Sequence, residues 1–315
     1  MATINDVAKM AGVGTTTVSR VINNSPLVSN ETKQKVLAAI NKLNYYPSNL
    51  ARGLATYSTH TIGLIMDNTM DKVYANPFIY EVFRGIEKSV YEGGYNLLLL
   101  GKNTRQNGKL AVENVLHGKM VDGLILQNHL IVSNYLDNIE KYKLPIVAIG
   151  KLDKKYNISS VDIDNFNAGY ICAQHLYEKG YKKIAFAGID PNKIFANDRY
   201  IGYKKYIKEK GLIPIVPNES FSNVDSIICI DNIYAYKIML KCKKLGKKIP
   251  NDIGIITFDN YPLAEYVEPP ITNIETDLYE VGIQAGNEIL RKLKDNSNDA
   301  RSIKVPVSIN IRSST

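Results

Sequence analysis

The sequence is short of the residues on which disulfide frameworks and metal sites depend. It holds only three cysteines, whose number is odd and whose positions are scattered. This pattern indicates reduced thiols in a reducing compartment rather than a disulfide-bonded secreted fold. No two cysteines have the spacing of metal ligands, so we expect neither a bound metal nor another cofactor. The cysteines are Cys172, Cys229 and Cys242.

The sequence also lacks the motifs of common enzyme classes. No serine stands in the nucleophile motif of hydrolases, and no glycine-rich phosphate-binding loop is present. Asp162 and Asp164 could be taken as paired catalytic acids, but on a strand they would point to opposite faces. The four histidines lie far apart, at His60, His117, His129 and His175. We therefore expect a protein that is not an enzyme.

No long hydrophobic run occurs in the 315 residues, although 45% of them are apolar. We therefore expect no membrane span. The amino terminus lacks the basic and apolar regions of a secretory signal, which predicts a cytoplasmic location. A chain of this length and composition is expected to form a small head and a larger body of two parts.

Basic residues, in contrast, are in surplus. The formal net charge is +8, and residues 1–60 hold six lysines and arginines against two acids, a net charge of +4. Half of the surplus thus lies in about a fifth of the chain. Such a concentration suits a nucleic-acid partner for the amino-terminal part.

The amino-terminal residues predict two short helices joined by a tight turn. Thr3 is a good N-cap, and the apolar residues that follow it recur at helical spacing until Gly12 ends the helix. In the second helix one face is apolar, while Thr16 and Arg20, four residues apart, share the opposite face. The apolar residues are Ile4, Val7, Ala8 and Ala11 in the first helix, and Val18, Val21 and Ile22 in the second.

The free face of the second helix suits the major groove of DNA. Arginine can donate two hydrogen bonds to guanine, and threonine can meet phosphates, base edges or a thymine methyl. Arg20 is therefore the first candidate for base recognition. Taken alone, the same face could be an ordinary solvated helix surface.

A third helix is predicted to complete the head. Ser29 is its N-cap, Glu31 lies near the positive end of its dipole, and Val36, Ala39, Ile40 and Leu43 line its inner face. Three helices in fewer than fifty residues can close a small core. Pro47 ends this bundle, and the first strand is expected near Thr61.

At this point the chain resembles the lactose/galactose repressor family of bacterial transcription regulators, essentially from end to end. The resemblance implies a helix-turn-helix DNA-binding domain at residues 1–48, with double-stranded operator DNA as its partner. The segments that carry it are Thr3-Ile4-Asn5-Asp6-Val7-Ala8, Thr16-Thr17-Val18-Ser19-Arg20-Val21-Ile22-Asn23, Asn44-Tyr45-Tyr46-Pro47-Ser48 and Ala51-Arg52-Gly53-Leu54-Ala55. The DNA contacts that it implies are Thr15, Thr16, Thr17, Ser19, Arg20, Asn23, Ala51 and Leu54.

The resemblance also implies a hinge helix at residues 49–57 that folds only on operator DNA. Leu54 of each subunit of a homodimer would then be wedged into the minor groove. Physical chemistry agrees, because a helix of about seven residues is too short to be stable alone in water, and an inserted leucine can kink a base step. The alternative is that Leu54 is buried against the effector domain.

From Thr61 onward, short apolar runs alternate with helical patterns, which is typical of a parallel sheet covered by helices on both faces. The predicted strands are 62–66, 97–100, 123–126, 146–149, 161–163, 184–187, 227–230 and 253–257. Further helices are expected from Phe78 to Gly93 and near 108–117, 168–179, 198–210, 233–245 and 278–294. The fold class is thus α/β, with an all-α amino-terminal head.

The resemblance implies that residues 58–315, the effector-binding and dimerisation domain, form two doubly wound, parallel-sheet subdomains of the periplasmic-binding-protein type. The first would comprise about 61–160 and 277–302. The second would comprise about 161–276 and 303–315. Ligands of such sheets bind outside the carboxyl ends of the strands, here in the cleft between the subdomains.

Five residues near those strand ends are candidate effector ligands. Asp164 and Asp259 match family positions that hydrogen-bond the effector, and Arg199 matches the arginine that holds it in a fork of two hydrogen bonds. Phe78 and Phe221 offer flat apolar faces for a sugar or base ring. The simpler alternatives are a turn or helix cap for each aspartate and a hydrophobic anchor for Phe78.

The chain departs from the family between Gly211 and the strand that starts near Ser226. The family usually has a strand, a loop and a full helix here, whereas this chain has only fourteen residues, Leu212 to Asp225. We expect one helix of the second subdomain to be absent and one face of its sheet to be uncovered or closed differently. This departure weakens the case for Phe221.

The sequence therefore predicts a repressor that binds a palindromic operator as a homodimer and is controlled by a small metabolite, a sugar or sugar phosphate. The alternative is the same regulator under the control of a protein partner, such as a phosphorylated carrier protein. A sugar-binding protein without regulatory output is a third hypothesis, which the amino-terminal head opposes.

Overall fold

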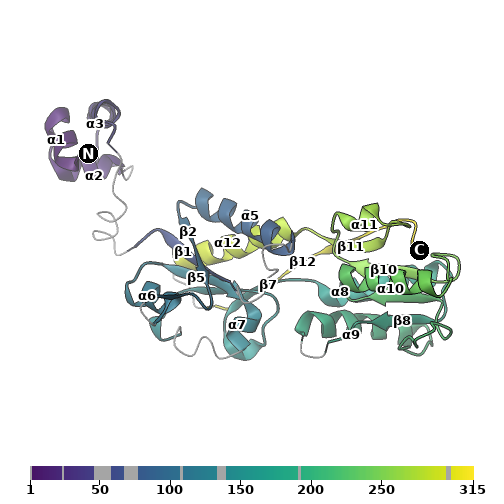
Figure 1. The fold of residues 1–315 in the computed structure, drawn as a ribbon. Coiled ribbons are helices and arrows are strands. Elements are labelled where there is room, and N and C mark those ends of the chain that lie inside the picture. The colour runs from purple at the N-terminus through teal and green to yellow at the C-terminus, as the bar shows by residue number, and fades with distance from the viewer. Residues whose placement is uncertain are drawn as a thin grey trace. The chain divides into compact units, whose positions relative to one another are not determined.

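A computed structural model describes residues 2–22, 25–45, 58–66, 77–106, 109–132, 140–190, 193–295 and 299–315 (Figure 1). The predicted hinge helix at 49–57, with Ala51 and Leu54, lies outside the described residues, as does Asn23. The chain forms two compact units. The head is made by Met1–His60 together with Lys119–Val121, and the body by Thr61–Gly118 and Asp122–Thr315.

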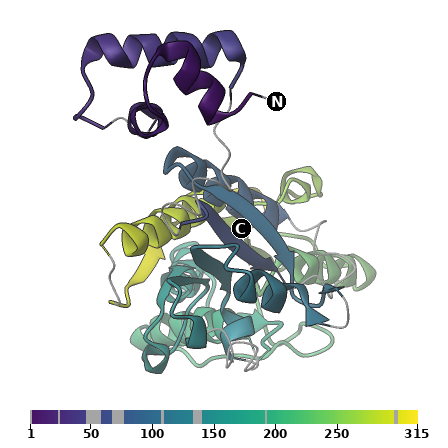
Figure 2. The same ribbon diagram turned by 90° about the vertical axis from the view of Figure 1, so that its left-hand side faces the viewer.

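The head contains the three predicted helices, α1 (Ile4–Ala11), α2 (Thr15–Ile22) and α3 (Asn30–Leu43) (Figure 2). Their inner faces meet in one small core, in which Val7, Val18 and Val36 are fully buried. The apolar spacing of the sequence therefore predicted the buried faces correctly.

Local hydrogen bonds fix the helix ends of the head. The Thr3 side chain accepts a hydrogen bond from the backbone N–H of Asp6. In return, the Asp6 carboxylate accepts from the backbone N–H of Thr3, so α1 begins with a capping box. α1 ends at Gly12, which adopts a left-handed conformation with φ of +68°. Ser29 caps α3 as predicted, accepting from the backbone N–H of Thr32 at 3.3 Å.

The first subdomain of the body is built on a six-stranded parallel sheet with the order β12-β7-β6-β5-β1-β2. Helices α5 and α12 pack against this sheet and form a core with it, whose buried residues include Ile62, Val147 and Ile289. The strands are β1 (Thr61–Met66), β2 (Asn96–Gly101), β5 (Gly123–Gln127), β6 (Ile146–Ile149), β7 (Ser159–Ile163) and β12 (Ser302–Val305). The helices are α5 (Pro77–Glu92), α6 (Ala111–His117), α7 (Asn128–Val132) and α12 (Leu278–Asp295), and β3 (Arg105–Gln106) pairs with β4 (Lys109–Leu110).

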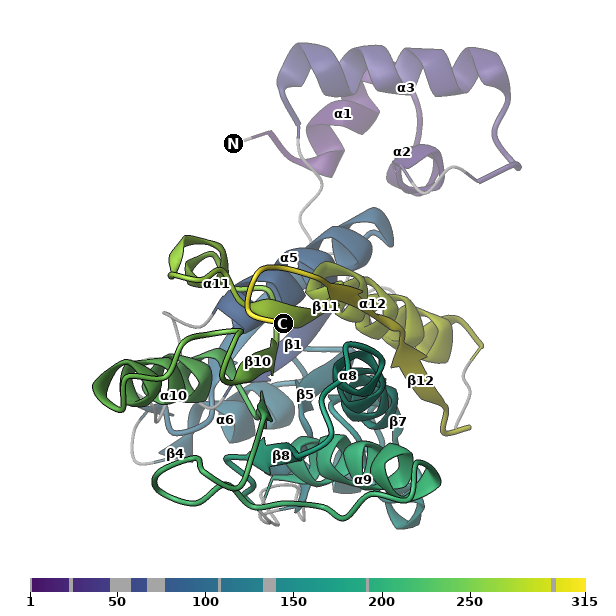
Figure 3. The same ribbon diagram turned by 90° about the vertical axis from the view of Figure 1, so that its right-hand side faces the viewer.

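The second subdomain has a five-stranded sheet with the order β13-β11-β10-β9-β8, in which only β13 is antiparallel to its neighbour. Along β8, Ile184 and Phe186 face the core under α8 and α9, whereas Ala185 and Ala187 face the core under α10 (Figure 3). The strands are β8 (Ile184–Ala187), β9 (Ser226–Cys229), β10 (Gly254–Phe258), β11 (Thr272–Thr276) and β13 (Val307–Asn310). The helices are α8 (Asn165–Glu178), α9 (Ile194–Glu209), α10 (Asn232–Lys244) and α11 (Leu263–Tyr266).

The sheets correct the predicted boundaries of the subdomains. β7 and β12 both belong to the first sheet, so residues 161–163 and 303–305 were assigned to the wrong subdomain. The reason is packing, because Val161, Ile163 and Val305 fill the core of the first subdomain. The chain therefore crosses between subdomains at three single residues, Asp164, Asp277 and Pro306.

The shortened segment of residues 212–225 contains no helix, as predicted. Ile215 forms an isolated parallel bridge with Ala185 of the edge strand β8. Phe221 and Val224 are buried and pack against Ala185 and Ile227 in the core beside α10. Side chains of a loop thus close the sheet face that a helix would otherwise cover.

Each subdomain contains a pair of helices that cross with their backbones in contact. A Cβ atom added at Gly85 of α5 would overlap the backbone of α12, and one added at Gly282 of α12 would overlap α5. In the second subdomain, a Cβ atom added at Gly169 of α8 would overlap the backbone of α9, and one added at Gly202 of α9 would overlap α8. The Cα of Gly169 faces the backbone carbonyl of Arg199, so the close crossing fixes the position of that residue.

Candidate DNA-reading helix and effector cleft

Helix α2 presents the predicted polar face to solvent. Val18 and Val21 are buried in the core of the head, whereas Arg20 and three other predicted DNA contacts are exposed and Thr17 is half-buried. The helix thus has one face for packing and one face free for a partner, as the spacing predicted. The exposed contacts besides Arg20 are Thr15, Thr16 and Ser19.

In the body, the predicted effector ligand Arg199 is held in place by hydrogen bonds and aromatic contacts. It lies in α9, only 5% exposed, and donates from Nε to Asn165 Oδ1 and from Nη1 to the carbonyl oxygen of Ile230, both at 2.9 Å. Its guanidinium carbon is 4.2 Å from the ring centroid of Phe258 and 5.1 Å from that of Phe195. Two hydrogen bonds and two aromatic faces therefore fix the plane of the guanidinium.

Asp259 follows β10, at the strand end where it was predicted, and lies beside Arg199. The distance from Arg199 Nη2 to Asp259 Oδ1 is 3.7 Å. Burial raises the pKa of the Asp259 carboxyl, and the charge of Arg199 opposes this effect. Asn232 donates to the carbonyl oxygens of Phe258 and Asp259, at 2.9 and 2.7 Å, and so holds the loop that carries the carboxyl.

Asp164 has the structural role that was kept as its alternative. Its side chain accepts from the backbone N–H of Asn167 at 3.4 Å and so caps α8. It also accepts from Lys304 Nζ at 3.1 Å. A further role in effector binding stays a prediction.

Four polar residues near Arg199 were not predicted as ligands. Asp162 accepts from Asn165 Nδ2 at 3.3 Å, and burial raises the pKa of its carboxyl to about 6. Lys151, which follows β6, forms an ion pair with Asp198 of α9 at 2.7 Å and so links the two subdomains. Asp198 directly precedes Arg199 in the sequence, which was the one signal that could have identified it.

Phe221 corrects a prediction. The ring is 2% exposed and lies in the core beside α10, with Lys241 Nζ 5.0 Å from its centroid. The prediction that Phe221 offers a flat face to a ligand was wrong, because the shortened segment uses the ring to close the sheet. Phe78 is the second residue of α5, but its side chain lies outside the described residues.

A cavity of about 570 Å³ adjoins the site at Asp259. It lies where the chain crosses between the subdomains, since Asp277 and Pro306 both line it. Glu81 of α5 and Glu275 of β11 also contribute to its wall, so the lining is acidic. In the part of the chain that the structure describes, no group of three or more His, Cys, Asp or Glu could hold a metal ion. No helix among the same residues is long and apolar enough to cross a membrane.

Comparison with known protein families finds matches for both the head and the body. Residues 3–48 match the family described as "Bacterial regulatory proteins, lacI family". Residues 59–222 match "Periplasmic binding proteins and sugar binding domain of LacI family", and residues 173–315 match "Periplasmic binding protein-like domain". These matches agree with the predicted order of a helical head and two α/β subdomains.

Similarity to individual proteins extends over the whole chain. The HTH-type transcriptional repressor PurR of Histophilus somni (strain 129Pt) is 32% identical over 337 aligned positions, covering 100% of this chain and 99% of its own. Catabolite control protein A of Priestia megaterium is 30% identical, with 99% of each protein covered. Among solved structures, the lac repressor dimer bound to operator and the anti-inducer ONPF has a TM-score of 0.77 at 22% identity and covers 100% of this chain and 99% of its own.

Proposed function

The chain belongs to the lacI family of bacterial regulatory proteins and is a DNA-binding transcription repressor rather than an enzyme, and from this premise we propose how it recognises DNA and what controls it. We propose that a homodimer binds a near-palindromic operator in the cytoplasm. Each head places α2 in the major groove, where Arg20 donates to a guanine. The exposed polar face of α2 is the observation that carries this proposal.

The hinge at residues 49–57 completes the proposed contact with DNA. Leu54 of each subunit enters the minor groove and bends the operator, while Ala51, Asn23 and the threonines of α2 contact the duplex nearby. Two half-sites need two heads, so the proposal requires a dimer.

The second subdomain offers a surface for that dimer. Ile233 and Leu240 lie seven residues apart on α10 and are 63% and 61% exposed, and on α11 Leu263 and Tyr266 are 61% and 79% exposed. Both helices pack on the same core of the sheet, so these side chains lie on one side of the subdomain. We propose that a second copy of the chain covers them.

The effector is proposed to bind in the cleft where Arg199 and Asp259 meet. A buried arginine with a fixed plane and an adjacent carboxylate can hold the hydroxyl groups of a sugar or the oxygens of a sugar phosphate. Closure of the cleft on the ligand would change the spacing of the paired hinges, and so the affinity for operator DNA. Asp164 and Phe78 stay candidate ligands of the same site.

Operator binding tests the DNA contacts. The affinity of the full-length chain for its operator should fall steeply as salt rises, because lysines and arginines displace counterions from DNA. Arg20→Ala should cost about 1 to 3 kcal/mol and relax the preference at one base pair, whereas Leu54→Ala should weaken binding and reduce the bend. Gel-shift titration on operator variants and a DNA-bending assay measure these effects. Unchanged binding in both variants would refute this mode of recognition.

A thermal-shift screen of the full-length chain against sugars, sugar phosphates and nucleobases tests the effector. One compound should raise the melting temperature, and the rise should be lost in Arg199→Ala. If no compound has this effect and a phosphorylated carrier protein alone changes operator affinity, control by a protein partner replaces the proposal.

A further inference from the structure

The surplus positive charge of the body lies entirely in its second subdomain. Residues 61–164 and 277–306, which belong to the first subdomain, hold seventeen lysines and arginines and seventeen acidic residues. Residues 165–276 and 307–315, which belong to the second, hold sixteen lysines and arginines against twelve acidic residues, a net charge of +4. The second subdomain thus carries as large a surplus as the DNA-reading head.

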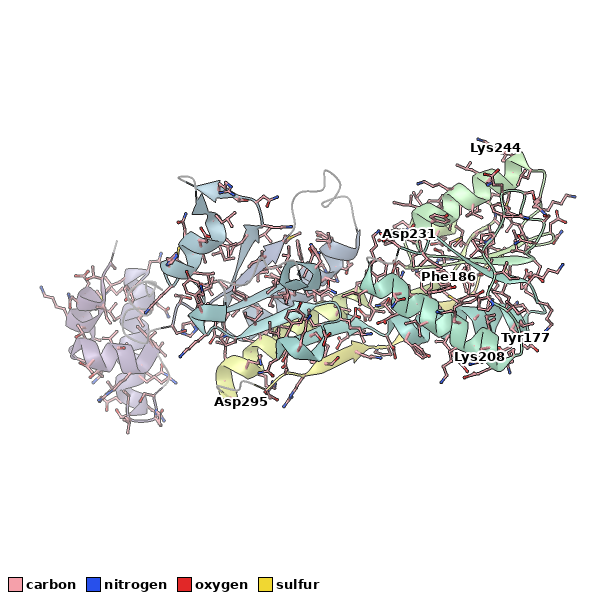
Figure 4. All side chains as sticks on the ribbon, turned by 90° about the horizontal axis from the view of Figure 1, so that it is seen from below. Tyr177, Phe186, Lys208, Asp231, Lys244 and Asp295 are labelled. Atoms are coloured by element: carbon pink, nitrogen blue, oxygen red, sulfur yellow. The ribbon has the colours of Figure 1, made fainter. Side chains whose placement is uncertain are left out.

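This charge is concentrated at one end of the second subdomain, which we call the basic end. Because β8, β9 and β10 are parallel, the helices that join them return the chain, so the carboxyl ends of these helices lie beside the amino ends of the strands. Figure 4 shows Lys208 and Lys244 there, away from the first subdomain, with Asp231 at the other end of α10. The turns and helix ends at residues 178–183, 208–225 and 241–252 hold five acidic residues and ten lysines, which are Lys179, Lys182, Lys183, Lys208, Lys210, Lys241, Lys243, Lys244, Lys247 and Lys248.

The acidic residues of the basic end do not pair with its lysine side chains. Asp225 accepts hydrogen bonds from the backbone N–H groups of Lys182 and Lys183, at 2.7 and 2.9 Å. Asp252 accepts from the backbone N–H of Lys248 at 2.7 Å. Among the residues that the structure describes, none of the ten lysine side chains forms an ion pair, and eight of them are exposed. The basic end therefore presents ammonium groups to solvent without a balancing carboxylate.

An aromatic ring holds two of these lysines together. Lys182 Nζ, from the turn before β8, lies 3.6 Å from the centroid of the Tyr177 ring. Lys210 Nζ, which follows α9, lies 5.5 Å from the same centroid and 5.3 Å from that of Tyr206. A cation–π contact attracts a cation without removing its charge. Two ammonium groups from different turns are thus brought to one ring and remain available to an anion.

Helix dipoles account for only part of the basic end. A lysine in the last turn of a helix stabilises it by interacting with the negative end of the dipole, and this effect falls off within that turn. Four of the ten lysines have such a position, in α9 and α10. Four others lie in turns outside the helices, where the dipole does not favour them, namely Lys182, Lys183, Lys247 and Lys248.

We propose that the basic end binds the phosphate backbone of a second segment of duplex DNA, without sequence preference, while the heads hold the operator. Lysine contacts phosphates as a point charge, whereas base recognition relies on side chains that form two directed hydrogen bonds. A protein partner fits less well, because lysine is depleted at protein–protein interfaces, where arginine and aromatic residues are enriched. The inference goes beyond the proposed function, in which only the head and the hinge contact DNA, and it makes the repressor a link between two DNA segments.

A bridging assay with the full-length protein tests the inference. The protein is bound to an immobilised operator duplex, and a fluorescent duplex without the operator is then added at low salt. The second duplex should be retained. The logarithm of its apparent affinity should fall linearly with the logarithm of the salt concentration, with a slope of about −0.9 for each phosphate that a lysine contacts. Phosphatidylglycerol vesicles added in place of the second duplex test an anionic membrane surface as the partner.

Two triple variants test the residues. Lys183→Gln, Lys208→Gln and Lys244→Gln together should weaken retention of the second duplex by about tenfold or more and reduce the salt slope by about 2 to 3, because phosphate contacts are lost. The control combines three substitutions that remove the same charge from exposed lysines of the first subdomain, and it should change retention by less than about twofold. Both variants should bind the operator like the wild-type chain, and circular dichroism confirms that each is folded. The control substitutions are Lys143→Gln, Lys155→Gln and Lys294→Gln.

Acetylation of lysines, read by mass spectrometry, gives a measurement that does not depend on the operator. An excess of any duplex at low salt should reduce the reactivity of Lys183, Lys208 and Lys244 by at least about threefold, because bound phosphates cover their ammonium groups. Lys294 of the first subdomain should react equally with and without DNA.

The outcomes separate this inference from the proposed function. If the operator is bound but no second duplex is retained, or if both triple variants retain it equally, the inference is overturned and the proposed recognition of the operator stands. If the operator is not bound, the proposed function fails, and protection of the three lysines by DNA, or its absence, still decides the inference. Vesicles that protect these lysines at a salt concentration at which DNA does not would put a membrane surface in the place of DNA and overturn it.

Discussion

The two subdomains of the body share an architecture but close their sheets differently. In the first, helices cover a six-stranded sheet whose pairs are all parallel. In the second, the loop of residues 212–225 contains no helix and places Phe221 and Val224 in the core beside α10. The core of the second subdomain therefore depends on a few loop side chains, although this subdomain holds Arg199 and Asp259.

Two carboxylates of the body differ in how the surrounding residues balance their charge. Glu288 of α12 is 3% exposed, and although burial raises its pKa, hydrogen bonds from Arg291 and Ser159 outweigh this and lower it. For Asp162, at the cleft, burial outweighs the hydrogen bonds from Ile163 and Asn165 and the charge of Arg199, so the pKa of its carboxyl is raised to about 6. The charge of the first carboxylate is balanced by the fold and stabilises it, whereas ionisation of the second carboxylate costs stability.

The largest effect is expected for Phe221→Ala. The substitution removes a buried ring that replaces a helix, so the free energy of unfolding should fall by about 3 to 5 kcal/mol. Urea denaturation measures the loss. Val216→Ala in the same loop is the control, because Val216 is 73% exposed and its truncation should change stability by less than about 0.5 kcal/mol. Equal effects of the two changes would mean that the loop does not close the sheet.

Asp162→Asn should stabilise the protein at pH 7. Because the folded-state pKa is about 6 and the ordinary value is 3.8, the wild-type chain loses stability as pH rises from 3.8 through 6, by at most about 3 kcal/mol. The asparagine variant does not titrate and should keep that stability. Urea denaturation at pH 5 and pH 7.5 measures the difference between the two proteins.

Glu288→Gln is the matched test of the other buried carboxylate. Its lowered pKa predicts the opposite sign, so this variant should be less stable than the wild-type chain at pH 7. If Asp162→Asn were also destabilising, the contrast between the two carboxylates would be wrong.

Gly169→Ala and Gly282→Ala separate stability from ligand binding. Each added methyl would overlap the backbone of the crossing helix, and each should cost about 1 to 3 kcal/mol. Only Gly169→Ala displaces the backbone of Arg199, so only this variant should weaken effector binding. Denaturation together with calorimetry checks both effects. Equal loss of affinity in the two variants would show that the close crossing of α8 and α9 has no special part in placing Arg199.

The sequence predicted the regular elements well, because each of the eight proposed strands is a short apolar run and the six proposed body helices lie between or after these runs. It missed β11, whose residues Thr272–Thr276 mix polar and apolar side chains, and the short helices α7 and α11. Residues 303–315 were assigned as one block to the second subdomain, whereas Pro306 separates β12 from β13, which pair in different sheets. Periodicity identifies a strand, but the sheet that it joins depends on distant partners.

The candidate site was predicted only in part, for the same reason. Arg199 and Asp259 were identified together, and the structure places them 3.7 Å apart. The ion pair between Lys151 and Asp198 joins residues 47 positions apart in the sequence, and no local pattern indicates it. Phe221 was misplaced because a buried ring and a ligand-binding ring look alike in sequence.

The three crossings between the subdomains limit how the body can move. Asp164 and Asp277 each cap the helix that follows, with hydrogen bonds to Asn167 and Glu280, and Pro306 has a ring that fixes φ near −65°. Because each link is one residue long, very few rotatable backbone bonds connect the two sheets. Any opening of the cleft between the two sheets must therefore rotate all three links together.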